Sequence, residues 1–265
     1  MAHKIDELLH IMARLRDPDK GCPWDLKQDW HSIAPYTLEE AHEVVDAIER
    51  EDFAELKSEL GDLLFQVVFY ARMGEEEGRF RFDDIVDAIC EKMIRRHPHV
   101  FANVRHEDER ALKAAWEAEK SRERGERQEN DSLLDGVAAA LPALVRADKL
   151  QKRAARVGFD WPDATGAMDK LLEELAEVKQ AVDTGDRNAL QDELGDLLFA
   201  AVNIARLLGV DAEQALRRGN RNFERRFRAM EKLLEAEGHK KLEMLEPRQL
   251  EDAWERVKAR EKINV

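Results

Sequence analysis

Acidic side chains recur along this sequence at spacings that suit a bound metal ion. Glu40 and Glu43 are three residues apart, as are Glu59 and Asp62, and residues three or four apart share one face of a helix. If the two helices pack antiparallel, four carboxylates converge and their like charges oppose ionisation. A divalent cation removes this opposition, and carboxylate oxygens suit Mg²⁺ or Mn²⁺. The same spacings return in the second half of the chain, at Glu174, Glu177, Glu193 and Asp196.

Two other interpretations of these acids are open. Carboxylates near a helix start stabilise the helix dipole, but that role does not account for Gly61 and Gly195. Each lies within an expected helix beside the acids, at a cost of about 1 kcal/mol relative to Ala, which is useful where another backbone or a ligand comes close. A di-iron site is suggested by Glu39-x-x-His42. The position that matches His42 in the second half is Ala176, so we favour Mg²⁺ or Mn²⁺.

The acids belong to an internal duplication. The heptapeptide ELGDLLF occurs at 59–65 and again at 193–199, and the match extends in both directions at a constant offset of 134 residues. Downstream, a shift of four residues at the turn-like segment 74–81 restores the alignment. We therefore predict an N-terminal domain at 1–122, a polar linker at 123–132 and a C-terminal domain at 133–265.

The composition predicts an all-α fold. Among 265 residues, 38% are charged and only 6% aromatic, a balance that favours long amphipathic helices over many short strands. We expect a first helix at 5–15, an irregular loop at 17–36, and an N-cap at Thr37 with Glu40 completing a capping box. Asp52 can cap the next helix, to about Met73. Further helices are expected at about 83–96, 107–120, 133–157 with a break near Pro142, 167–183, 188–208, 211–235 and 247–262.

Charge and apolar content limit the partners of this chain. The formal net charge of −14 argues against binding nucleic acid through phosphate neutralisation, which needs an excess of Lys and Arg. Cys22 and Cys90 form neither a disulfide framework nor a metal-binding spacing. We find no apolar run long enough for a membrane helix and no signal peptide pattern, so we expect a cytoplasmic protein with no membrane partner.

The ordered acids and several short motifs together resemble the MazG family of nucleoside triphosphate pyrophosphohydrolases. The family pattern is two Glu, a third Glu three residues later, and then Glu-x-x-Asp on a second helix. Similar motifs occur at Cys22–Asp25 (CPWD), Arg95–Phe101 (RRHPHVF) and Asn222–Phe227 (NFERRF). The resemblance extends over nearly the whole chain. It implies two tandem MazG-like helical modules of the four-helix-bundle type, which associate as a homodimer.

The resemblance also implies an activity and the residues that support it. The expected reaction converts NTPs or dNTPs to the monophosphate and pyrophosphate by attack of water on the α-phosphate, with Mg²⁺ as cofactor. The C-terminal half is the main candidate, and the N-terminal set Glu40, Glu43, Glu59 and Asp62 is a second possible metal site. The implied metal ligands are Glu174, Glu177, Glu193 and Asp196. The implied nucleotide-binding residues are Lys170, Glu174, Asn222, Arg226 and Trp254, and the implied catalytic carboxylates are Glu173 and Asp192.

One position departs from the family pattern. The family has a lysine where this chain has Asn222, and Lys92 occupies the matching place in the first half. Arg221 is next to it but points about 100° away on a helix. We therefore expect a weaker phosphate clamp in the C-terminal half. The basic residues around Arg226 could instead form a solvated stripe, and Trp254 could be a core residue.

A second class of function stays open on the sequence alone. The chain could be a non-catalytic helical adaptor whose acidic faces bind a protein partner, with the repeat providing avidity. Such an adaptor has no need of glycine beside buried acids. Stabilisation by Mg²⁺ with nucleotide would distinguish the enzyme from the adaptor.

Overall fold

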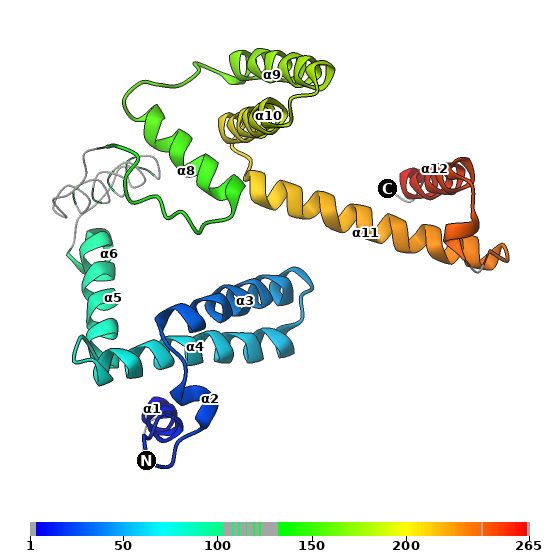
Figure 1. The fold of residues 1–265 in the computed structure, drawn as a ribbon. Coiled ribbons are helices and arrows are strands. Elements are labelled where there is room, and N and C mark those ends of the chain that lie inside the picture. The colour runs from blue at the N-terminus through cyan, green and yellow to red at the C-terminus, as the bar shows by residue number, and fades with distance from the viewer. Residues whose placement is uncertain are drawn as a thin grey trace. The chain divides into compact units, whose positions relative to one another are not determined.

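The structure, a computed structural model, consists of two compact helical units, residues 1–126 and 127–265 (Figure 1). It describes residues 4–102, 132–239 and 241–263, together with Asp108, Ala111, Ala115, Glu119 and Arg122. Every regular element in these ranges is a helix, which confirms the all-α prediction. No helix of the described ranges is both long enough and apolar enough to cross a lipid bilayer.

The first unit is built around a helical hairpin. Helices α3 and α4 are joined by a short turn and pack side by side, and α1 packs against α4. Met12 on α1 lies in a buried core with Ile33 of α3 and Val68, Phe69 and Met73 of α4. The helices of this unit are α1 (Lys4–Leu15), α2 (Pro23–Leu26), α3 (Trp30–Glu49), α4 (Phe53–Glu76), α5 (Phe82–Arg96) and α6 (Pro98–Phe101).

Helix α3 begins earlier than the sequence suggested. The side chain of Asp29 accepts hydrogen bonds from the backbone N–H groups of His31 and Ser32, and Ser32 completes the capping box. Thr37 is therefore not an N-cap, and its hydroxyl lies 2.7 Å from the Tyr70 hydroxyl on α4. Pro35 is tolerated in the second turn, where its missing N–H removes one helical hydrogen bond. The prediction was wrong because Pro35 was taken as a helix breaker.

Other helix boundaries agree with expectation. Asp52 caps α4 by accepting from the Glu55 N–H, and α5 ends just before Pro98. The predicted helix at 107–120 lies largely outside the described residues, as does the predicted linker at 123–132 except for Ser132.

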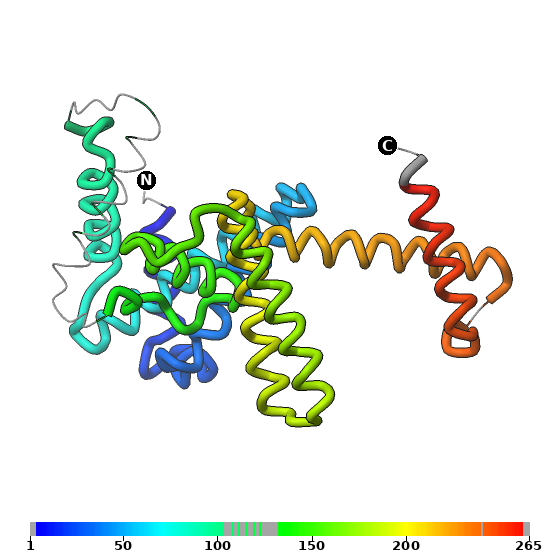
Figure 2. Tube along the Cα trace, turned by 90° about the horizontal axis from the view of Figure 1, so that it is seen from above, coloured from blue at the N-terminus to red at the C-terminus, as the bar shows by residue number. Residues whose placement is uncertain are grey.

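The second unit repeats the hairpin and adds a long arm. Helices α9 and α10 form the hairpin, and α8 packs against α10. Helix α11 starts beside α8 and α10 and leaves them, and α12 packs on α11 around Met230, Leu234, Ala253 and Val257 (Figure 2). The elements are α8 (Ala143–Ala155), α9 (Ala164–Thr184), α10 (Arg187–Leu207), α11 (Ala212–Ala236), the 3₁₀ turn η1 (Leu242–Met244) and α12 (Pro247–Ile263).

The predicted helix at 133–157 was wrong in its first half. Residues 133–136 form turns, in which Gly136 has a φ of 74°, and α8 begins only after Pro142. Gly136 in the left-handed conformation and Pro142 both interrupt helical backbone hydrogen bonding. The apolar spacing of this segment does not overcome that interruption. The helices predicted at 167–183, 188–208, 211–235 and 247–262 are each present within a few residues.

A nearly buried arginine joins the loop before α3 to helix α4. Arg16 donates to the carbonyl oxygens of Asp25, at 2.6 Å, and Gln28, and it forms a 2.7 Å ion pair with Glu76. Its guanidinium also lies over the Phe69 ring. Burial alone would raise the pKa of Glu76, but hydrogen bonds from Arg16 and Arg72 outweigh burial and lower that pKa below its usual range.

We expect Arg16→Met to destabilise the first unit by about 2 kcal/mol at pH 7, because two carbonyl oxygens and a carboxylate lose a charged donor. A carboxyl group with a lowered folded-state pKa stabilises the fold above its ordinary pKa and loses that effect as pH falls through the folded value. The difference from wild type should therefore shrink below about pH 4. Urea unfolding of both proteins at pH 7 and pH 3 measures this difference in the free energy of unfolding. Equal stability at pH 7 would show that the network does not stabilise the fold.

Candidate active site

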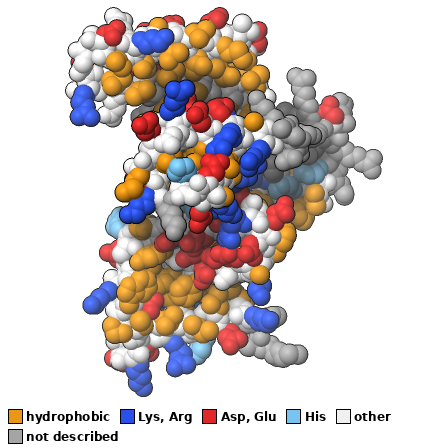
Figure 3. Space-filling view, turned by 90° about the vertical axis from the view of Figure 1, so that its right-hand side faces the viewer, with side chains coloured by type: hydrophobic (Ala, Val, Ile, Leu, Met, Phe, Trp, Pro, Cys, Tyr) orange, Lys and Arg blue, Asp and Glu red, His pale blue; other side chains and the backbone are white. Residues whose placement is uncertain are grey.

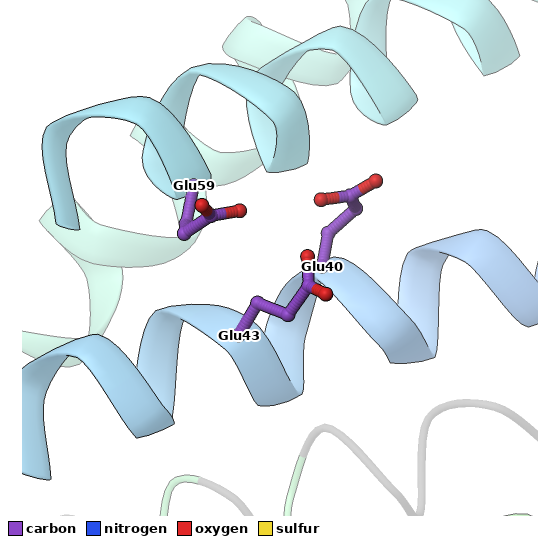
Figure 4. Close-up of side chains that lie close together, drawn as sticks. All are labelled: Glu40, Glu43 and Glu59. Atoms are coloured by element: carbon purple, nitrogen blue, oxygen red, sulfur yellow. The ribbon is translucent and has the colours of Figure 1, made fainter. Parts of the chain in front are cut away.

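Three of the predicted N-terminal acids converge between the hairpin helices. Glu40 and Glu43 project from α3 toward Glu59 on α4 (Figure 4). One carboxylate oxygen of each lies within 4.8 Å of the others. The turn at residues 50–52 sets this register, because it folds α4 back along α3 and brings the two acid-bearing faces together.

The N-terminal cluster is electrostatically unfavourable without a cation. Burial, Asp62 and Glu43 raise the pKa of Glu40, in that order of effect. Burial and the charges of Glu43 and Asp62 likewise raise the pKa of Glu59. Among the described residues, no Lys or Arg forms an ion pair with Glu40, Glu43 or Glu59. The repulsion is therefore not relieved by the described part of the chain.

The C-terminal cluster has the same plan but contains its own cation. Glu174 and Glu177 on α9 approach Glu193 on α10, again with carboxylate oxygens within 4.8 Å. Lys170 Nζ lies 2.7 Å from Glu174 Oε1 and 2.7 Å from Glu173 Oε1. Its hydrogen bond lowers the pKa of the buried Glu174, whereas the hydrogen bond between the two carboxyl groups raises the pKa of Glu177. The residue that matches Lys170 in the first half is Tyr36.

The fourth acid of each predicted set does not join its cluster. Asp62 and Asp196 are exposed, and neither belongs to the group of oxygens within 4.8 Å. Asp62 is still close enough to raise the pKa of Glu40. An Asp side chain is one methylene shorter than Glu, so it does not reach as far across the hairpin. The predicted catalytic carboxylates Glu173 and Asp192 are exposed on the same two helices.

Lys170 and Glu174 lie in the acidic cluster on α9, whereas the other predicted nucleotide-binding residues, Asn222, Arg226 and Trp254, form a second group on α11 and α12. Arg226 Nε lies 2.8 Å from Glu261 Oε2, and Asn222 Oδ1 accepts from Arg225. The rings of Trp254 and Phe223 pack with centroids 5.4 Å apart. The family resemblance implied one site that combines these residues with the acids. Within the chain they lie apart, because α11 is a helix of 25 residues, about 37 Å long, and α12 packs on α11 (Figure 2).

Apolar residues next to the acids were not identified as functional from the sequence. Leu60 and Leu64 on α4 are 50% and 41% exposed, and Leu194 and Leu198 on α10 are 42% and 58% exposed. Leu60 matches Leu194 and Leu64 matches Leu198 in the duplication. The repetition of these leucines beside the acids was therefore a sequence signal that could have identified them. On the face drawn in Figure 3, acidic side chains lie beside a broad hydrophobic surface. Large exposed apolar surfaces of this kind are typical of interaction sites.

Gly61 and Gly195 are adjacent to these leucines. A Cβ added at either position would meet no atom within 4 Å in the described part of the chain. The close approach expected from the sequence is therefore not made by the hairpin itself. Space remains there for a group from outside the hairpin.

The acidic clusters fit a small divalent ion. Oxygen ligands about 2.1 Å from Mg²⁺ lie at most about 4.2 Å from one another, so small side-chain rotations suffice in either cluster. Burial and the neighbouring carboxylates raise the pKa of Glu40, and a bound cation would oppose that shift. In the C-terminal cluster, Glu177 and Glu193 remain available while Lys170 occupies one side of Glu174.

Comparisons with known proteins match the sequence of both hairpins. The model of the MazG nucleotide pyrophosphohydrolase domain matches residues 28–101 and 164–230, which include both hairpins. The chain is 53% identical over 265 residues to "Nucleoside triphosphate pyrophosphohydrolase" of Escherichia coli (strain K12), covering 98% of each chain. It is 42% identical over 254 residues to "Nucleoside triphosphate pyrophosphohydrolase/pyrophosphatase MazG" of Thermotoga maritima, covering 96% of this chain and 95% of the relative.

We expect Glu40→Gln to raise the melting temperature of the metal-free protein at pH 7.5, because it removes a charge from the crowded cluster. A carboxyl group with a raised folded-state pKa favours folding below its ordinary pKa and loses that effect as pH rises through the folded value. Mg²⁺ should stabilise wild type more at pH 7.5 than at pH 5.5, since ligation needs ionised carboxylates. Differential scanning fluorimetry with and without Mg²⁺ tests both points. An equal Mg²⁺ response in Glu40→Gln would rule out ligation by Glu40.

Proposed function

The chain belongs to the MazG nucleotide pyrophosphohydrolase family, and we propose that it hydrolyses nucleoside triphosphates, ribo and deoxy, to the monophosphate and pyrophosphate with a divalent cation. The observation that supports this proposal best is the pair of three-carboxylate clusters at matching positions of two hairpins. Both clusters lie within the residues that the family model matches. Relatives that match almost end to end are named for this activity.

We place the principal site on the C-terminal hairpin. Glu174, Glu177 and Glu193 would hold Mg²⁺, with Mn²⁺ as a substitute, and Asp196 would join them by a side-chain rotation. When bound, the cation would offset the negative charge of the triphosphate and stabilise the charge that develops in the displacement. An acidic site of this kind needs that compensation before it can accept a polyanion.

The protein's own groups have separate tasks in this proposal. Glu173 or Asp192 accepts a proton from water as the new bond to the α-phosphorus forms. The bond from the α-phosphorus to the bridging oxygen breaks, and pyrophosphate leaves with that oxygen. Lys170, which is shared by Glu173 and Glu174 in this structure, can donate to a phosphate oxygen once Glu174 engages the cation. Lys170 is therefore paired with an anionic group both before and after the cation and substrate bind.

The arginine and tryptophan of the site come, in this proposal, from a second copy of the chain. Arg226 and Trp254 lie on an arm that extends from its own hairpin. The hairpin meanwhile leaves Leu194 and Leu198 exposed beside the acids, with open space at Gly195. A homodimer would bury these leucines and could place the arm of one copy against the acids of the other. Because Asn222 stands in place of a lysine, Arg226 is the residue of the arm that we assign to phosphate binding.

We expect Glu174→Gln to lower the rate of triphosphate hydrolysis by more than the roughly 10- to 100-fold typical of losing an outer-shell metal partner. Ion-exchange analysis of products from NTPs and dNTPs, with Mg²⁺ and with chelator, measures the effect. Wild type should release monophosphate and pyrophosphate only with the metal present. Glu40→Gln is the matched control for the N-terminal cluster. Release of diphosphate and phosphate by wild type would contradict attack at the α-phosphate.

Mixing inactive variants tests the shared site. Equal amounts of Glu174→Gln and Arg226→Ala, after subunit exchange, should regain about one quarter of wild-type activity, because half of the dimers are mixed and each has one intact site. A mixture of Glu174→Gln with Glu177→Gln should stay inactive, since both changes affect the same hairpin. Failure of the first mixture to regain activity, with exchange verified by mass spectrometry, would place both groups in one chain.

A further inference from the structure

The second unit contains a cavity that the proposed reaction does not use. It has a volume of about 490 Å³ and lies between α8, α10 and the loop at 158–161. Its lining is mainly apolar, with aromatic walls from Phe159, Trp161 and Phe199. None of its lining residues belongs to the acidic cluster or to the arm. The volume is in the range of small-molecule sites.

Two amides place defined polar atoms in this lining. Gln151 is 6% exposed, and its Nε2 donates to the carbonyl oxygen of Phe199 at 2.8 Å. A carbonyl only accepts, so the amide orientation is fixed and Oε1 is the remaining atom. Gln151 Oε1 is buried, and no described residue forms a hydrogen bond with it. A buried acceptor of this kind is costly unless a ligand or water donates to it.

The second amide supplies the complementary donor. Asn203 Oδ1 accepts from Arg206 Nε and Nη2, at 3.1 and 2.6 Å. Arginine only donates, so the amino group of Asn203 is the atom left for a ligand. The residues that line the cavity therefore include one side-chain acceptor and one side-chain donor together with the aromatic rings.

The walls are held in place by specific contacts. Arg206, whose side chain is 9% exposed, forms an ion pair with Asp160 and so fixes the loop to α10. A Cβ at Gly166 would lie 2.6 Å from the Trp161 ring, so the glycine lets this ring rest against the start of α9. Because the arginine charge is paired with Asp160, the lining has little net charge to attract an anion.

In the first unit, an aromatic side chain occupies the region that corresponds to this cavity. At the offset of 134, Phe69 matches Asn203 and Phe65 matches Phe199. Phe69 is 1% exposed and packs in the core with Met12 and Met73. Helix α1 packs on α4 there as α8 packs on α10 here. The two halves thus differ by a large aromatic ring in one core and a polar amide beside a cavity in the other.

We propose that this cavity binds the planar ring of a purine or pyrimidine. The ring would pack on Trp161 and Phe199, donate to Gln151 Oε1 and accept from the amino group of Asn203. An aliphatic ligand would leave Gln151 Oε1 and the amino group of Asn203 without a ligand partner, and an anion would find no unpaired cation among the described residues of the lining. The ring could be the base of the triphosphate or a separate nucleoside. The first test uses nucleosides without phosphate, so it does not depend on hydrolysis.

Isothermal titration calorimetry of the full-length protein with adenosine, guanosine, cytidine and uridine, without metal, tests the proposal. We expect at least one nucleoside to bind, and Asn203→Phe to weaken that binding at least 10-fold by placing the aromatic ring of the first unit in the cavity. Asn188→Phe makes the same change at an exposed position of α10 and should bind as wild type. Gln151→Met, which keeps the side-chain length, should also bind more weakly.

Several outcomes would overturn the proposal. One is that no nucleoside binds wild type, and another is that Asn203→Phe binds as well as Asn188→Phe. A third is that Trp161 fluorescence, isolated by difference from Trp161→Phe, responds to protein dilution but not to nucleoside, since an apolar side chain from another copy would then fill the cavity. Circular dichroism of each variant shows whether it is folded.

Hydrolysis kinetics then distinguish the two sources of the ring. If the base of the substrate occupies the cavity, the bound nucleoside should raise KM and leave kcat unchanged. If KM does not change, the cavity belongs to a separate nucleoside ligand. Either result is compatible with the ring-binding site, and the calorimetric result stands even if the triphosphates are not substrates.

Discussion

Repulsion among carboxylates held on two packed helices is the constraint on which both halves of this protein depend. A hairpin brings Glu40, Glu43 and Glu59 together in one half and the corresponding acids together in the other. Ordinary helical surfaces avoid such crowding, because each additional charge opposes ionisation of its neighbours. The two halves meet this constraint differently. The N-terminal cluster remains without a basic partner among the described residues, whereas Lys170 compensates Glu174 in the C-terminal cluster.

Local sequence signals predicted much of this structure because they act within one helix. Asp52 and Asp211 cap the helices whose starts they mark, and the spacing of the acids places them on facing sides of the hairpins. Opposing local signals were harder to predict from. Pro35 disfavours a helix and Asp29 caps one, and the structure shows that the helix capped by Asp29 forms. The separation of Arg226 from the acids could not be predicted at all. It depends on how far a straight helix extends, and the spacing of residues does not determine which partner an arm contacts.

The duplication left both halves with the same helical hairpin, but the residues packed on its inner side differ between the halves. Exposed leucines persist at matching positions on both hairpins, which is the pattern expected where a surface serves the same packing purpose twice. The interiors have not been kept alike. A fully buried Phe69 in one half corresponds to Asn203 beside a cavity in the other, although the flanking Val68 and Val202 are both buried. The hairpin framework evidently does not require the same core on its inner side.

Lys170 also bears on which ions the proposed C-terminal metal site would accept. An entering cation must compete with an ammonium group already 2.7 Å from Glu174. A potassium or sodium ion has the same charge as that ammonium group and gains no Coulombic advantage from replacing it. A divalent ion doubles the attraction at the same distance. If the proposed metal site forms here, Lys170 would act as an internal competitor that favours a divalent ion over a monovalent one by charge, without a size-selective filter.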